Sequence, residues 1–175
     1  MDTLSNTVLS AFLMQFGRPA TALGIAPGRL EFIGNHCDYN GGRVMGVSVD
    51  RQVAVAIAAR EDQTIQMASP DHATVTVPDA TQVKPLDGDE AWANYALGVL
   101  VMMREAGLHV ATGFDLCVAS DLPAGAGMSS SAAFELATAE ALALLGDFPR
   151  EAVALARLCR RAENDFVGMP CGILD

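Results

Sequence analysis

The sequence predicts an α+β domain in which helices pack on a mixed, mostly antiparallel sheet, and two observations support this. Strand-like and helix-like segments follow one another in mixed order along the chain. Hydrophobic residues make up 51% of the 175 residues and charged residues 18%, so the chain can bury a sizeable core and is not a disordered tail. This length corresponds to one ordinary domain or two very small ones.

The first half of the chain predicts one helix followed by strands. Residues 5–16 have the pattern of an amphipathic helix, and residues 25–33 that of a strand entering a polar, glycine-rich turn at 34–42. Apolar residues alternate well enough between 47 and 59 to predict a second strand. A hairpin follows between residues 64 and 77, with its turn at Pro70 and Asp71.

The second half is mainly helical. Residues 91–105 predict a helix that closes at Gly107, and residues 114–119 predict a short strand. A glycine-rich loop then opens a helix that ends at Gly146. The last helix is predicted from Pro149 to about Phe166, before an irregular segment interrupted by glycine and proline.

Charge and composition exclude several classes of protein. Eleven basic against 21 acidic residues give a net charge of −10, which disfavours nucleic acid as a partner. Apolar stretches such as 53–59 are too short to span a membrane, and the N-terminus has no basic segment of the kind that begins a signal peptide. The four cysteines form no C-x-x-C pair, so free thiols and a cytoplasmic location are expected.

The strongest local motif is PAGAGMSSS, residues 123–131. Glycines allow a backbone to approach a ligand closely, and the amides at a helix N-terminus favour a phosphate group. The alternative is a loop whose serines cap the helix without a ligand. It is not a Walker loop, because the one lysine, Lys84, lies far away; nor is it a dinucleotide fingerprint, because Ser130 stands where the third glycine belongs.

A nucleotide triphosphate held without lysine needs a divalent metal with oxygen ligands. Ser131 and Glu163 can supply a hydroxyl and a carboxylate if their two helices pack side by side. Considered alone, Glu163 is more often a solvated helix acid.

A second cluster joins Arg29 to the turn GNHCDYNGG at 34–42. Asn35, His36 and Asp38 bring an amide, an imidazole and a carboxylate into one turn, which suits the hydroxyls of a polyol. The alternative is an Asx-rich turn whose side chains bond to their own backbone. Asp175, if it lies beside Arg29, could accept a hydroxyl proton while the arginine neutralises phosphate oxygens; taken alone it is a solvated carboxylate.

Together these segments resemble the GHMP small-molecule kinases, and within them the galactokinases. A further stretch, AWANYALGV, resembles the family's W-x-N-Y segment, and the order and spacing agree with the family along essentially the whole chain. The three segments that carry the resemblance are APGRLEFIGNHCDYNGG (26–42), LPAGAGMSSSA (122–132) and AENDFVGMPCGILD (162–175).

The resemblance implies phosphorylation of the anomeric hydroxyl of galactose by ATP with Mg²⁺. In that reading Arg29 stabilises the transition state and Asp175 accepts the proton. The implied sugar-binding residues are Asn35, His36, Cys37, Asp38 and Gly172. The implied nucleotide-binding residues are Gly125, Ala126, Gly127, Met128, Ser129, Ser130 and Ser131 of the phosphate loop, with Trp92 near the adenine. The implied magnesium ligands are Ser131 and Glu163.

The resemblance also implies a fold and a missing partner. Residues 1–175 would form the family's N-terminal domain, of the ribosomal protein S5 domain 2-like type. A C-terminal domain with a further glycine-rich motif would pack against it, so the 175-residue chain alone is expected to have little or no kinase activity.

Two residues of the sugar turn depart from the family pattern. Asn35 replaces the usual glutamate and Cys37 the usual threonine, and a mismatched buried hydrogen bond changes specificity by roughly 2–4 kcal/mol. A kinase for N-acetylgalactosamine, arabinose or a uronic acid is therefore the first alternative. A non-catalytic sensor of sugar and ATP is the second, and a dinucleotide-binding module is the weakest.

Overall fold

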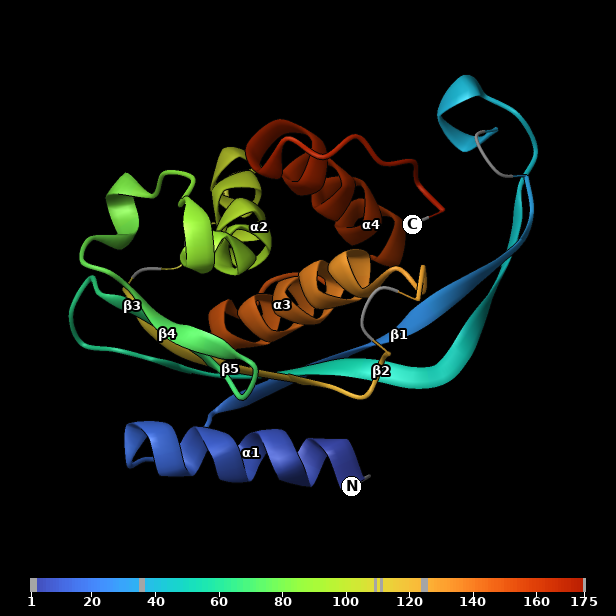
Figure 1. Cartoon of the computed structure of the whole chain (residues 1–175). Coiled ribbons are helices and arrows are strands. Elements are labelled where there is room, and N and C mark those ends of the chain that lie inside the picture. Colours follow the sequence, from blue (N-terminus) through green and yellow to red (C-terminus); the bar gives the residue numbers. More distant parts are fainter. Residues whose placement is uncertain (1–2, 35–36, 109, 111, 124–125, 175) are drawn as a thin grey trace.

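The computed structural model describes residues 3–34, 37–108, 110, 112–123 and 126–174. A single sheet separates two layers of helices (Figure 1). One face carries the N-terminal helix, and the other carries the remaining three (Figure 1). The α+β class with a mixed, mostly antiparallel sheet is confirmed.

The sheet has five strands in the order β1-β2-β5-β3-β4. The pairs β1/β2, β2/β5 and β3/β4 are antiparallel, whereas β3 and β5 run parallel. The strands are β1 (Ala22–Ile33), β2 (Met45–Ala59), β3 (Ile65–Ser69), β4 (His72–Val77) and β5 (Phe114–Ser120).

The predicted helices form, with two differences in detail. The helix predicted at 91–105 begins as a 3-10 turn, Gly88–Ala93, before it becomes α-helical. The last predicted helix begins later, where Glu151 caps it by accepting bonds from the amides of Val153 and Ala154, and it widens into a π-helical turn, Ala162–Val167. The helices are α1 (Thr3–Phe16), α2 (Asn94–Glu105), α3 (Ser130–Gly146) and α4 (Ala152–Arg161).

The second half of β2 is covered on both faces, which explains why six consecutive residues, 53–58, are buried. Val53, Val55 and Ile57 face the main core beneath α2 and α3. The alternating residues, Ala54, Ala56 and Ala58, face α1, where they meet Val8 and Phe12. The small side chains on this face allow α1 to lie close to the sheet.

The far ends of β1 and β2 extend as a paired arm beyond the helical layers (Figure 1). The 3-10 turn Asp38–Asn40 belongs to the connection at the end of this arm. Large apolar side chains are exposed along it, among them Phe32 at 74% and Ile33 at 63%. None of the helices in the described part of the chain combines the length and apolar character that a bilayer crossing requires.

Candidate active site

Arg29 lies on β1 and its backbone holds the phosphate loop. Its N–H donates to the carbonyl of Met128 at 3.1 Å, at an irregularity in the β1–β2 register between Pro27 and Arg29. Gly28 permits this approach, because a Cβ there would lie 2.9 Å from the Met128 carbonyl oxygen and 2.3 Å from the Leu122 side chain. The loop is therefore fixed against the strand that carries the arginine.

The Arg29 side chain reaches the C-terminal segment. Its Nε donates to the carbonyl of Leu174 at 2.9 Å, and the Leu174 N–H donates to Oδ2 of Asp38 at 2.7 Å. Gly46 on β2 leaves room for this junction, since a Cβ there would lie 3.0 Å from Cδ of Arg29. Residues 29, 38 and 174 thus meet at one place despite their separation along the chain.

Asp38 begins the turn at the end of the β1–β2 arm, and Gly172 packs directly against it. A Cβ on Gly172 would lie 1.9 Å from Oδ2 of Asp38, so a glycine is required for this contact. Cys37 is half-buried, and its carbonyl accepts from the N–H groups of Asn40 and Gly42. The backbone of the turn is therefore satisfied locally, while the Asp38 carboxylate is used to hold the C-terminal segment.

Four predicted site residues lie outside the described residues: Asn35, His36, Gly125 and Asp175. Their roles therefore rest on the sequence alone. Asp175 follows Leu174 directly in the chain, and Leu174 is bonded to both Arg29 and Asp38.

The phosphate loop turns sharply into α3. Gly127 and Ser129 have positive φ angles of 65° and 53°, and the left-handed conformation at a non-glycine residue costs on the order of 1 kcal/mol. Ser129 is the N-cap residue of α3, yet its side chain makes no capping hydrogen bond. Ser130 and Ser131 then open the helix, whose first-turn amides and dipole favour an anion.

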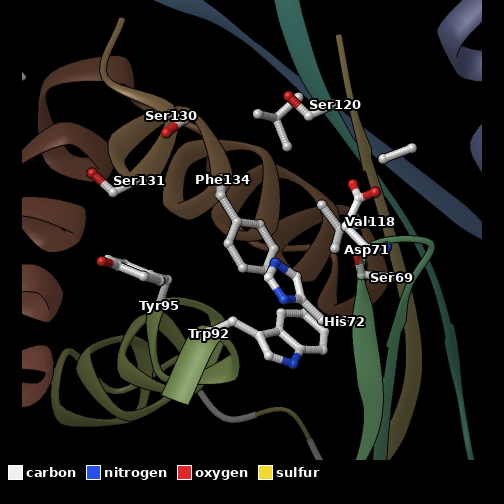
Figure 2. Close-up of a pocket in the computed structure, with 12 residues that line it drawn as sticks. Ser69, Asp71, His72, Trp92, Tyr95, Val118, Ser120, Ser130, Ser131 and Phe134 are labelled. Atoms are coloured by element: carbon white, nitrogen blue, oxygen red, sulfur yellow. Dashed lines mark hydrogen bonds between the residues drawn. The ribbon is translucent and has the colours of Figure 1, made fainter. Parts of the chain in front are cut away.

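A cavity of about 230 Å³ lies beside these serines (Figure 2). Trp92 stacks on His72, with ring centroids 5.4 Å apart, and on Phe134, at 6.2 Å. Its indole Nε1 is buried and has no hydrogen-bond partner. The hydroxyls of Ser130 and Ser131 and the phenol of Tyr95 line the other part of the cavity (Figure 2). The cavity therefore joins an aromatic end to the start of the phosphate loop helix.

Glu163 is buried, with 6% of its surface exposed, and its Oε2 has no hydrogen-bond partner. The alternative that Glu163 is a solvent-exposed acid on a helix surface is therefore wrong. Helix α3, which carries Ser131, packs against α4, and Glu163 lies in the π-helical turn that follows α4. A hydroxyl from Ser131 and an unpaired carboxylate oxygen are donors that Mg²⁺ accepts, so these residues fit the ion. Within the described chain, no group of three or more His, Cys, Asp or Glu residues could hold a metal.

Sequence reasoning missed several residues of this region. His72 and Tyr95 line the cavity; His72 belongs to no motif named above, and Tyr95 lies in the W-x-N-Y segment but was not assigned to the site. A further buried acid, Glu135, is 1% exposed and neither of its carboxyl oxygens has a partner. Its spacing of four residues from Ser131 places both on one face of a helix, and that signal was available in the sequence.

Two family models match the chain. The model described as the GHMP kinases N terminal domain matches residues 94–175, and the galactokinase galactose-binding signature matches residues 10–59. The first contains the phosphate loop and Glu163. The second contains Arg29 and the turn at Asp38.

Several curated proteins of similar sequence, and one similar solved structure, are galactokinases. The chain is 39% identical to the galactokinase of Streptomyces coelicolor over 99% of its own length and 45% of that protein, and 39% identical to the galactokinase of Roseiflexus over 94% and 41%. A crystal structure of Lactococcus lactis galactokinase complexed with galactose superposes with a TM-score of 0.88 at 32% identity, covering 99% of this chain and 45% of that one.

More distant structures share the fold. The Methanococcus jannaschii mevalonate kinase superposes with a TM-score of 0.73 at 19% identity, over 87% of this chain and 49% of that one. The chain spans less than half the length of the galactokinases that it matches.

Proposed function

Because the chain belongs to the GHMP kinase family and matches galactokinases along its length, we propose that the protein transfers the γ-phosphoryl group of ATP to the anomeric hydroxyl of galactose. One observation carries this proposal. Arg29 bonds through its backbone to the phosphate loop and through its side chain to Leu174, which in turn bonds to Asp38. A loop suited to phosphate, a cationic side chain and a polar turn suited to a sugar therefore share one site.

The chemistry requires a base, an electrophile and charge stabilisation. The anomeric oxygen forms a bond to the γ-phosphorus while the bond to the ADP oxygen breaks, and the hydroxyl proton passes to a carboxylate. We assign that carboxylate to Asp175 and the stabilisation of the phosphoryl oxygens to Arg29. Phosphoryl transfer depends mainly on positioning and electrostatics. Leu174, the residue next to Asp175, is held by the bond that its carbonyl accepts from Arg29 and by the bond that its N–H donates to Asp38.

The sugar would bind at the turn that carries Asp38. Of the predicted sugar residues, Cys37, Asp38 and Gly172 lie in the described chain, and the tight contact between Asp38 and Gly172 supports a rigid pocket wall there. Asn35 and His36 complete the proposed set from the sequence. The similar galactokinase of Lactococcus lactis was crystallised as a complex with galactose, which favours this sugar for the turn.

The nucleotide would place its base in the aromatic end of the 230 Å³ cavity and its phosphates at the start of α3. Trp92, His72 and Phe134 form the aromatic lining of that end of the cavity, and aromatic surfaces of this kind suit a purine. Residues 125–131 would supply backbone amides to the phosphates. Ser131 and Glu163 would hold Mg²⁺, whose positive charge neutralises phosphate oxygens when the ion is bound.

A second domain would complete the site. The galactokinases that match this chain are more than twice as long as the region matched, and the apolar side chains on the β1–β2 arm are exposed. We infer that a C-terminal domain packs against this one in the whole protein. The partners of the site would be the sugar and ATP, rather than nucleic acid or a membrane.

The direct test is an assay of ATP-dependent sugar phosphorylation. The protein expressed from its complete reading frame is incubated with galactose, N-acetylgalactosamine, arabinose or galacturonic acid, and ADP release is followed. We expect the highest kcat/KM with galactose. Phosphorylation of another sugar but not of galactose would favour the sibling kinase, which the amide of Asn35 in place of a carboxylate makes the first alternative.

Removing the proposed proton acceptor distinguishes a kinase from a sensor that binds sugar and ATP without catalysing a reaction. Asp175→Ala should abolish turnover while ATP binding, measured by calorimetry, remains. A wild-type protein that binds both ligands and produces no sugar phosphate would instead favour the sensor.

A further inference from the structure

Two glutamates lie together in the interior on the α3 side of the sheet. Glu135 comes from α3 and Glu163 from the π-helical turn Ala162–Val167. They are 1% and 6% exposed, respectively. Among the described residues, both carboxyl oxygens of Glu135 and Oε2 of Glu163 have no hydrogen-bond partner. Buried acids in such surroundings are costly unless a proton or a cation compensates their charge.

Both glutamates line one small cavity of about 20 Å³. That volume is enough for one water molecule, which needs polar partners of the kind the two carboxyl groups provide. Two carboxyl groups that share one small cavity repel each other when both are charged, and a nearby cation offsets this cost.

Glu135 lies in the second turn of α3, close to the start of that helix. It follows Ser131 by four residues, so both side chains lie on the same face of the helix. Tyr95 connects the two regions, because it lines the nucleotide cavity with Ser131 while Glu163 and Glu135 both contribute to raising its pKa, after the larger effect of burial. Ser131 lines the nucleotide cavity, and its neighbour Ala132 lines the small cavity with Glu135 and Glu163, so the first turn of α3 borders both.

We propose that Glu135 is a positioning residue of the divalent-cation site, accepting a hydrogen bond from a water molecule that lies between it and the cation held by Ser131 and Glu163. This rests on the proposed function. Mg²⁺ keeps several of its waters when it binds proteins, and the small cavity provides a place for one of them. Glu163 alone offers one negative charge, and Glu135 supplies a second within the same interior.

The inference is tested by metal binding rather than by turnover. Mn²⁺ replaces Mg²⁺ in the protein expressed from its complete reading frame, with ADP present, and water proton relaxation distinguishes protein-held Mn²⁺ from Mn²⁺–ADP in solution. Glu135→Gln should weaken Mn²⁺ binding by about 10–100-fold, as loss of an outer-shell partner does. Affinity for ADP without metal should not change.

Glu140→Gln is the matched control, because Glu140 lies on the same helix in a partly exposed ion pair with Arg150 at 3.2 Å. It should change Mn²⁺ affinity less than about twofold. If Glu135→Gln fails to fold, Glu135→Asp, which keeps the charge but withdraws it by one methylene, should also weaken Mn²⁺ binding.

The outcomes separate the two proposals. Wild-type Mn²⁺ affinity in the folded Glu135 variant overturns this inference and leaves the proposed kinase intact. A wild-type protein that binds no Mn²⁺ in the presence of nucleotide overturns both the inference and the proposed cation site.

Discussion

At the level of single residues, Gly172 sets the position of the sugar turn. Its Cα hydrogen faces Asp38 so closely that a methyl group would overlap Oδ2, at 1.9 Å. The Asp38 carboxylate accepts a hydrogen bond from the Leu174 N–H at 2.7 Å. It cannot move away from Gly172 without breaking that bond. A glycine after a cysteine carries no signal of its own in a sequence, so its importance follows from the tertiary contact.

Gly172→Ala should therefore impair sugar binding without unfolding the protein. Displacing a positioning carboxylate by about 1 Å can reduce turnover on the order of 100-fold. We expect kcat/KM for the sugar to fall by at least about tenfold while the KM for ATP changes little. Ile173→Ala, at a neighbouring exposed side chain, is the control. Equal effects of the two substitutions on sugar kinetics would contradict the assigned contact.

The cysteines differ in their environments. Burial raises the pKa of Cys117 to about 11 and that of Cys159 well above its usual value. The thiolate is the reactive form, and at pH 8 it is about one part in a thousand of Cys117. Cys37 and Cys171 are half-buried.

Alkylation of the native protein with iodoacetamide at pH 8 should thus modify Cys37 and Cys171 before Cys117 and Cys159, as mapped by mass spectrometry. The rate at Cys117 should rise about tenfold per pH unit toward pH 11, because the thiolate fraction rises in that direction. Modification of Cys117 at pH 8 as fast as Cys37 would show that its surroundings are not those described.

The sequence could not show which acids are buried: Glu163 was expected as a magnesium ligand through the family resemblance, and Glu135 was not predicted. Glu163 has the same helical spacing as a surface acid, and only the packing of α2 and α4 around the π-helical turn makes it interior. The spacing of Glu135 from Ser131 indicates that both lie on one helix face. The burial of that face, however, depends on how the core assembles. By contrast, the glycine-rich turn into α3 could be predicted, because its motif depends on local backbone chemistry; the roles of Arg29 and of this loop stay predictions.

At the level of elements, α1, β2 and β5 are tied together at one edge by a buried acid. Asp115 on β5 is 2% exposed. It accepts from Arg18, which follows α1, at 2.5 Å, and from Arg60, which follows β2, at 2.8 Å. Both arginines are partly exposed, so the carboxylate is the buried member of the network.

Asp115→Asn should lower the free energy of unfolding by on the order of 2–3 kcal/mol, below the cost for a fully buried ion pair, because the arginines retain access to water. Urea denaturation measures this change. Glu105→Gln, which breaks an exposed pair with Arg161 at 2.7 Å, should cost less than about 1 kcal/mol. If Asp115→Asn lowers the free energy of unfolding no more than Glu105→Gln does, the network has no structural role.

Most elements could be predicted from periodicity and turn residues, because these are local signals. Strands 25–33 and 47–59 were predicted within a few residues of β1 and β2. The exception is the last helix, where the widening at Ala162 has no local signal. Gly98 of α2 lies against that turn, and a Cβ there would be 3.2 Å from Phe166 and 3.3 Å from Ala162, so close packing accompanies the altered winding.

At the level of the whole molecule, the β1–β2 arm exposes an apolar surface that a lone domain would not be expected to carry. Phe32, Ile33, Met45 and Val47 are each at least half exposed. Surfaces of this kind mark interfaces or cause association. Together with the partial coverage of the longer galactokinases, this supports a second domain that covers the arm.

The 175-residue chain expressed alone should therefore self-associate and show little or no kinase activity. Size-exclusion chromatography with light scattering should detect the association, and Phe32→Ser should reduce it. In the protein from the complete reading frame, both the association and its response to Phe32→Ser should be smaller. Robust turnover by a monomeric 175-residue chain would contradict the need for a second domain.

The account depends most on one claim: that Arg29, the Asp38 turn and the phosphate loop form a single site for phosphoryl transfer. A crystal structure of the protein from its complete reading frame, with galactose and a non-hydrolysable ATP analogue, tests it directly. We expect the anomeric oxygen about 3–3.5 Å from the γ-phosphorus, beside Arg29 and Asp175. Galactose bound away from this junction, or phosphates away from the start of α3, would contradict the account.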